Sequence, residues 1–107
     1  MNPYPYIKAA DLMCMPSRYE GKPMVVTESM ILGTPPVVTE YLSSHEQIKN
    51  GVEGIIVNND DTSIIDTVCK CAKDSSAIES MHSYLLQHKY GNKDYVRYIE
   101  KILFEEL

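Results

Sequence analysis

The sequence lacks any apolar run approaching the roughly 20 residues that a membrane span requires. Its first residues, Met1 to Lys8, lack the basic stretch followed by an apolar one that marks a secretory signal. A cytoplasmic chain with neither signal nor anchor is therefore expected. Basic clusters are also missing, since the 10 Lys and Arg are scattered singly and the formal charge is −5. Because a nucleic-acid interface needs a basic patch, no nucleic-acid partner is expected.

Cysteine is scarce, with Cys14, Cys69 and Cys71 as the three instances. An odd number of thiols fits a reducing compartment. Cys69 and Cys71 lie two positions apart in a helical pattern, so they point to different faces and predict neither a disulfide nor a metal site. All three are interpreted as small buried side chains. No metal-ligand spacing links the histidines to each other or to the cysteines, so neither a metal ion nor another cofactor is expected.

What is present is typical of one small globular domain. The 107 residues are 44% hydrophobic and 23% charged, which fits a folded chain with a core. Three short apolar runs without polar alternation predict strands buried on both faces of a parallel sheet, at residues 12–15, 36–39 and 54–57. Pro36 is acceptable there because it would be the first residue of its strand.

Helical spacing predicts helices at residues 5–10, 23–32, 61–73, 76–89 and about 95–106. Gly33 would follow the end of the second helix, and Asp60 or Asp61 would cap the third. This mixture of strands and helices predicts an α/β fold. Three strands make only half of a doubly wound sheet, so a partial Rossmann-like sheet with flanking helices is expected. The chain divides into a β/α portion, residues 2–60, and C-terminal helices, residues 61–107.

The stretch from Ser17 to Val38 carries the chemistry. It begins at the carboxyl end of the first strand, where open α/β sheets bind ligands. A helix N-terminus follows, at which the amides of Lys22, Met24 and Val25 would favour a phosphate, while Gly21 permits close approach of a ligand. The carboxylates of Glu20 and Glu28 can accept hydrogen bonds from sugar hydroxyls. That combination suits a nucleotide sugar, although spacing alone fits a loop glutamate plus a solvated helix glutamate equally well.

The ordered set of residues resembles a known family: Ala10-Asp11, Pro16-Ser17, Glu20-Gly21, Glu28, Leu32-Gly33, Pro35, Glu46, Gly51 and Gly54-Ile55. It is similar to the donor-binding half of glycosyltransferase family 4, the group 1 glycosyltransferases of GT-B fold, over about residues 2–62. The resemblance implies the C-terminal half of the second GT-B domain. It departs from the family at residues 41–44, Tyr-Leu-Ser-Ser, where relatives often have two glycines.

The resemblance also implies separate roles for the two glutamates. Glu20 would face the transferred sugar and its anomeric carbon, as the catalytic electrostatic and positioning group, and Glu28 would hold the ribose hydroxyls. Amides near Gly21, Met24 and Val25 would contact the sugar and the diphosphate. The family retains anomeric configuration and generally needs no bound metal, because an Arg and Lys pair earlier in the domain balances the diphosphate charge. This chain has no match for that Arg and Lys pair.

The implied function is sugar transfer from a nucleotide-sugar donor to an acceptor, in bacterial assembly of a polysaccharide, glycolipid or glycoprotein. An N-terminal acceptor domain of the same protein is the expected partner, and peripheral membrane association is expected of the full-length enzyme only. The fragment alone is expected to be inactive, to bind donor weakly and to dimerise through its uncovered surfaces. Two alternatives stay open: a non-catalytic nucleotide or nucleotide-sugar binding module, and a nucleotide-sugar epimerase of the same fold.

Overall fold

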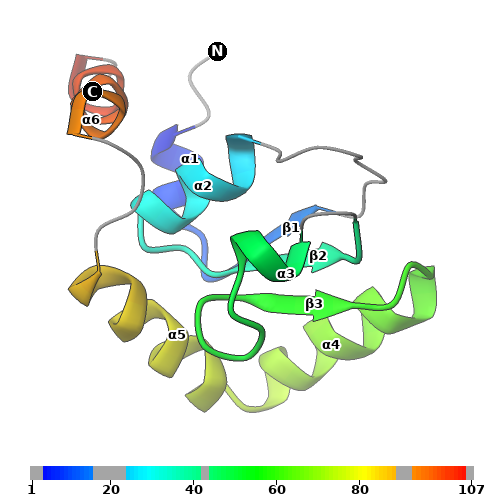
Figure 1. Ribbon diagram of the computed structural model, residues 1–107. Coiled ribbons are helices and arrows are strands. Elements are labelled where there is room, and N and C mark those ends of the chain that lie inside the picture. The colour runs from blue at the N-terminus through cyan, green and yellow to red at the C-terminus, as the bar shows by residue number, and fades with distance from the viewer. Residues whose placement is uncertain (1–3, 16–23, 42–43, 89–92, 106–107) are drawn as a thin grey trace.

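A computed structural model describes residues 4–15, 24–41, 44–88 and 93–105 of the chain (Figure 1). The described residues form three strands and six helices, which alternate up to β3 and then end in three helices: α1 (Tyr4–Ala9), β1 (Met13–Met15), α2 (Met24–Ile31), β2 (Pro36–Thr39), α3 (Ser44–Gln47), β3 (Ile55–Val57), α4 (Asp61–Lys73), α5 (Ser76–Gln87) and α6 (Lys93–Glu105). The strands form one parallel sheet in the order β1-β2-β3. This confirms the predicted α/β fold with a partial Rossmann-like sheet.

The central strand β2 is buried along its whole length. Pro36 is its first residue, as predicted. The Met13 amide of β1 donates a hydrogen bond to the carbonyl of Pro35, the residue before β2, at 3.0 Å. Register places Cys14 beside Val37 and Met15 beside Val38. Because side chains alternate along a strand, these two rows face opposite sides of the sheet.

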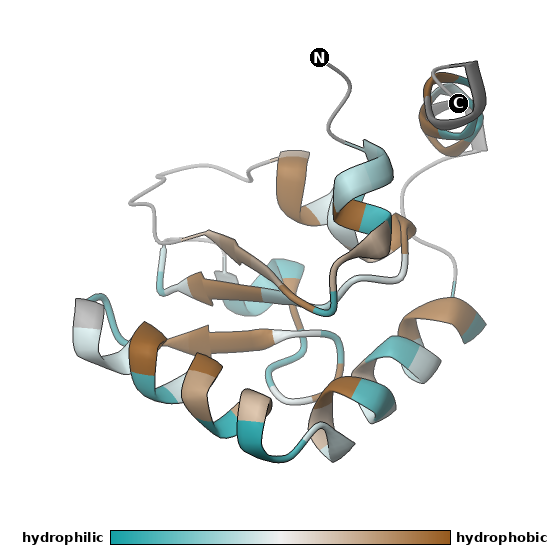
Figure 2. Ribbon diagram, turned by 180° about the vertical axis from the view of Figure 1, so that it is seen from behind, coloured by the Kyte–Doolittle hydropathy of each residue, from teal (hydrophilic) through white to brown (hydrophobic). Residues whose placement is uncertain are grey.

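One face of the sheet carries the main apolar cluster, which joins β1 and β2 to α2 and α5. Its buried members are Met15, Val26, Met30, Val38, Tyr41, Ile48 and Leu85. Helix α4 packs on β2 and β3 from the other face, and Figure 2 shows the apolar strands between the helices. A second cluster, made of Tyr4, Leu32 and Ile99 with neighbouring isoleucines, binds α6 to α1 and the end of α2.

The prediction that all strands and cysteines are buried is wrong in part. Cys14 of β1 and Cys69 of α4 are exposed, and only Cys71 is buried. Cys14 lies in the row of side chains opposite the main cluster, on a strand at the edge of the described sheet, and this edge position leaves its side chain exposed. Strand β3 forms the other edge of the described sheet, and this position leaves it half-buried.

Most helix boundaries agree with the sequence pattern. Helix α4 spans Asp61–Lys73 with Asp60 as its N-cap, as predicted. Helix α2 ends at Ile31, one residue before the predicted end, and its predicted start at residue 23 lies outside the described residues. Gly33 comes after the helix at a φ of +82°, the left-handed conformation that glycine adopts without steric cost. Helix α3 was not predicted, although Ser44 and Gln47 have the Ser-x-x-Gln spacing typical of a helix start.

Candidate functional site

The candidate site lies where β1 leads through residues 16–23 into α2, at the carboxyl edge of the sheet. Residues 16–23 are outside the described part of the chain, so the predictions for Glu20, Gly21 and Lys22 stay predictions. The other three predicted residues, Met24, Val25 and Glu28, all lie on α2. The described part of the site is therefore one helix and its neighbours.

The first turn of α2 has the chemistry that an anion needs. Among the described residues of α2, the amides of Met24, Val25 and Val26 precede the first intrahelical hydrogen bond, so they have no acceptor within that part of the helix. The helix dipole adds partial positive charge at the same end. The Met24 side chain is 53% exposed at this terminus, while Val25 packs against the main apolar cluster. Packing of Val25 thus anchors a turn whose amides can point outward.

The Glu28 side chain is half-buried and lies toward α1 rather than standing in open solvent. It accepts a hydrogen bond from the hydroxyl of Tyr4, a residue that is buried in the second apolar cluster. Burial raises the pKa of Tyr4, and the charge and hydrogen bond of Glu28 raise it further, with Tyr98 of α6 adding a smaller effect. Three helices therefore meet around the Tyr4 hydroxyl: α1 carries it, α2 brings Glu28 and α6 brings Tyr98.

A second polar group at this edge was missed by the sequence interpretation. Gln47 of α3 donates from Nε2 to Thr27 Oγ1 of α2 at 3.0 Å, and its Oε1 accepts a hydrogen bond from the Tyr41 hydroxyl. Tyr41 lies two residues after the end of β2 and is buried, and burial raises the pKa of its hydroxyl. This Thr27–Gln47–Tyr41 bridge connects α2, α3 and the carboxyl end of the central strand. Only its side-chain contacts reveal it, since the three residues are 20 and 6 positions apart.

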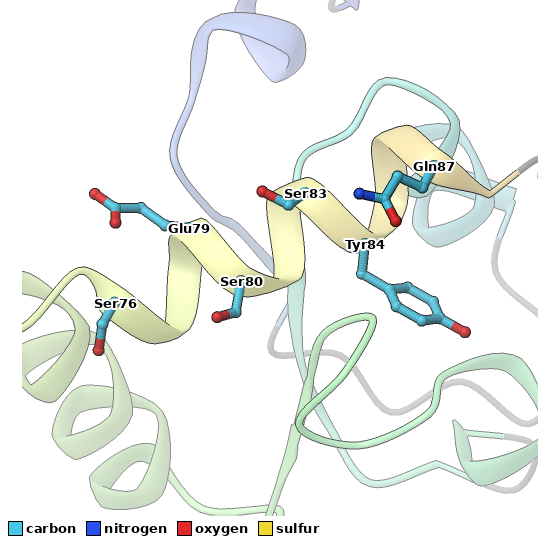
Figure 3. Close-up of a pocket in the computed structure, with 6 residues that line it drawn as sticks. All are labelled: Ser76, Glu79, Ser80, Ser83, Tyr84 and Gln87. Atoms are coloured by element: carbon cyan, nitrogen blue, oxygen red, sulfur yellow. The ribbon is translucent and has the colours of Figure 1, made fainter.

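An open depression of about 520 Å³ lies elsewhere, along α5 (Figure 3). Its lining residues all belong to that helix: Ser76, Glu79, Ser80, Ser83, Tyr84 and Gln87. The Tyr84 ring stacks on His88 at 3.8 Å, and the Tyr84 hydroxyl lies 3.5 Å from Lys49 Nζ. Lys49 precedes β3, so this contact lies at the amino end of a strand, opposite the edge where a donor is expected. The depression is not part of the candidate site.

Other reactive groups offer little chemistry within the described residues. The Cys14 side chain is exposed, but its thiol is partly desolvated against the sheet; this desolvation raises its pKa and the nearby Cys71 raises it further, so Cys14 stays a protonated, weak nucleophile at neutral pH. No group of three or more His, Cys, Asp or Glu among the residues described could hold a metal ion. Within the same ranges, every helix is too short or too polar to cross a membrane. All three histidines are exposed, as predicted.

The parallel sheet, with a helix beginning beyond the carboxyl end of β1, defines a partial Rossmann-like α/β protein. Comparison with known families identifies it further: the family described as Glycosyl transferases group 1 matches residues 2–87. The match covers most of the chain, and the chain belongs to this family. The resemblance inferred from the sequence is thus confirmed.

Individual relatives are distant and much longer. A UDP-Gal:alpha-D-GlcNAc-diphosphoundecaprenol alpha-1,3-galactosyltransferase of Escherichia coli is 29% identical over 64% of this chain and 18% of its own length. The Vi polysaccharide biosynthesis protein VipC/TviE of Salmonella typhi is 31% identical over 64% of this chain and 12% of its own length. An uncharacterized 41.2 kDa protein in the cps region of Klebsiella pneumoniae is 34% identical over 52% of this chain and 16% of its own length. The chain spans less than a fifth of each of these relatives.

Proposed function

We propose that this chain forms the nucleotide-sugar-binding side of a retaining glycosyltransferase of hexosyltransferase type, which transfers a sugar to an acceptor in polysaccharide, glycolipid or glycoprotein assembly. The family match over residues 2–87 carries the proposal. The names of two relatives, a galactosyltransferase and a Vi polysaccharide biosynthesis protein, support the same class of reaction. An acceptor-binding domain would complete the enzyme, because transfer requires donor and acceptor held together.

Each site residue has a proposed task. The first-turn amides of α2 at Met24 and Val25, with Gly21 and Lys22 before them, bind the donor's diphosphate and sugar without a metal ion. Glu28 binds the ribose hydroxyls. A carboxylate has about four acceptor positions, so its hydrogen bond from Tyr4 is compatible with ribose binding and also orients it. Glu20 stabilises charge that develops on the transferred sugar.

Kinetics of two variants in the enzyme complete with its acceptor domain test these roles. Glu28→Gln loses charge-assisted hydrogen bonds to ribose, worth about 1.5 to 3 kcal/mol, and should raise the donor KM more than it lowers kcat. Glu20→Gln should lower kcat on the order of one hundredfold with a smaller effect on donor affinity. Circular dichroism checks that each variant is folded.

Glu79→Gln is the matched control, because Glu79 is an exposed glutamate on α5, outside the candidate site. It should leave both constants unchanged. If Glu20→Gln and Glu28→Gln also keep the wild-type kcat and donor KM, the two carboxylates are surface residues and the site assignment is wrong. Analysis of the anomeric configuration of the product by NMR tests retention separately.

A further inference from the structure

Gln47 occupies a position that ties three elements together at the carboxyl edge of the sheet. Its amide uses both ends: Nε2 donates to Thr27 of α2, and Oε1 accepts from Tyr41 after β2. Tyr41 also fixes the start of α3, because Ser44 Oγ donates to the Tyr41 carbonyl at 2.9 Å. Helix α3 is thus anchored to the end of β2 at both of its termini, and Gln47 extends that anchor to α2.

The bridge has a defined direction. Tyr41 is 7% exposed, and burial raises the pKa of its hydroxyl, so at neutral pH it stays protonated and donates its single proton. That proton goes to Gln47 Oε1, and the amide NH₂ is thereby turned toward Thr27. The Tyr41 hydroxyl is buried, so losing the Gln47 amide removes the acceptor that this hydroxyl requires. The three side chains therefore act as one unit.

Thr27 is the point at which this unit holds α2. It lies one turn after Met24 and directly before Glu28. A contact here restrains the first turn of α2, which the apolar packing of Val26 and Met30 fixes only on its inner side. Hydrogen bonding adds a directional restraint that apolar packing does not supply.

We propose that Gln47 is a positioning residue for donor binding: it holds α2 in the orientation that presents the first-turn amides and Glu28 to a nucleoside diphosphate. This inference rests on the proposed function, and Gln47 itself is not assigned a contact with the donor.

The test measures binding of UDP, GDP and ADP to this chain by NMR titration, at a temperature where melting curves show every variant folded. Gln47→Met removes both polar ends at similar length, and Thr27→Val removes only the hydroxyl. For whichever of these nucleotides binds the wild type, each variant should raise the Kd about three- to tenfold, the range for losing one or two neutral hydrogen bonds. Thr27→Ser keeps the hydroxyl and should bind like wild type. Gln87→Met, on an exposed position of α5, is the matched control.

Amide hydrogen exchange supplies a readout that does not depend on the ligand. The amides of residues 28–31 bond back to the first turns of α2, so their exchange should be faster in Gln47→Met and Thr27→Val and unchanged in Gln87→Met. Unchanged Kd and unchanged local exchange in Gln47→Met, even with a lower Tm, would overturn the positioning role. If the wild type binds no nucleotide, the proposed donor site is refuted. Faster exchange in Gln47→Met would then still support the role of Gln47 in holding α2.

Discussion

At the scale of single residues, two glycines are required for different reasons. A Cβ added at Gly54 would lie 2.5 Å from the Pro36 carbonyl oxygen and 2.9 Å from the Pro36 ring, because β2 and the start of β3 approach closely there. A Cβ at Gly51 would meet nothing within 4 Å, but its φ is +84°. Close backbone contact thus constrains one position and backbone conformation constrains the other.

These causes predict that asparagine costs more stability than alanine at Gly54 and less than alanine at Gly51. Gly54→Ala should destabilise the chain by about 3 kcal/mol, as expected for overpacking against a backbone that cannot yield, and Gly54→Asn by more. Gly51→Ala should cost about 1 kcal/mol, and Gly51→Asn less, because asparagine tolerates the left-handed region. Urea denaturation of the four variants measures the free energies of unfolding. Equal costs for alanine at both positions would contradict the proposed close contact at Gly54.

Two buried tyrosines predict how stability depends on alkaline pH. Tyr4 and Tyr41 both have a pKa raised above 10.0 in the folded chain, so the folded state retains protons that the unfolded state loses. Stability from these groups is fully present below pH 10.0 and declines as pH rises through their folded pKa values. The slope is at most about 1.4 kcal/mol per pH unit for each tyrosine.

Denaturation of Tyr4→Phe and Tyr41→Phe at pH values on both sides of the ordinary tyrosine pKa checks this sign. Each variant should lose stability less steeply than wild type at alkaline pH, because phenylalanine does not titrate. Tyr6→Phe is the matched control, since Tyr6 is 68% exposed in α1. A steeper loss in either buried-site variant would show that the folded state does not favour the protonated tyrosine.

The residues that sequence interpretation identified correctly are those with a local signature. Gly33 follows a helical period, Asp60 precedes one, and Pro36 begins an apolar run, so neighbouring residues determine each. The partners of Tyr4, Tyr41 and Gln47 could not be predicted, because their bonds join segments that only the folded chain brings together. The same limit applied to Cys14, whose exposure depends on the place of β1 at the edge of the described sheet.

At the scale of elements, α4 has the most clearly specified start. The Asp60 carboxylate accepts from the Ser63 amide at 2.7 Å and from the Ser63 hydroxyl at 3.0 Å. One of the four unsatisfied amides at the helix start is thereby bonded, and the negative charge lies at the favourable end of the dipole. These bonds explain why a polar pair followed by an apolar period was enough to predict the boundary.

Removing this cap should shorten or destabilise α4. Asp60→Ala is expected to cost about 1 kcal/mol of unfolding free energy, whereas Asp60→Asn keeps an acceptor and should cost less. Asp66→Ala is the control, because Asp66 is an exposed residue inside the same helix and alanine is the better helix former there. Thermal and urea denaturation measure all three. A loss for Asp66→Ala as large as that for Asp60→Ala would show that the effect is not capping.

Elements differed in how well their pattern predicted them. Helices α4 and α5 and the buried strand β2 have clear hydrophobic patterns and were predicted nearly to the residue. Helix α3 has only 4 residues, too few for a helical period to appear. Its side chains bond to Tyr41 and Thr27, outside the helix, and neither propensity nor a helical period reveals such bonds.

At the scale of the whole molecule, the sheet ends at β1 in the part of the chain that the structure describes. The Met13 amide donates to the chain beside β2. Because successive residues of a strand direct their peptide groups to opposite sides, the N–H and C=O of Cys14 point away from β2, toward the open edge. The Cys14 side chain is exposed beside them. An unpaired edge next to apolar surface is a template for pairing with another chain. The predicted dimerisation therefore has a specific candidate surface.

This surface predicts reversible association through β1 that one charged side chain should prevent. In sedimentation velocity with a reductant present, the wild-type sedimentation coefficient should rise with protein concentration, because pairing of two β1 edges buries unpaired peptide groups. Cys14→Lys places a solvated charge at that edge and should keep the chain monomeric across the same range. Cys69→Lys makes the same change at an exposed position of α4 and should associate like wild type. If wild type stays monomeric at the highest concentration, or if both lysine variants associate equally, β1 is not the surface through which copies of this chain meet.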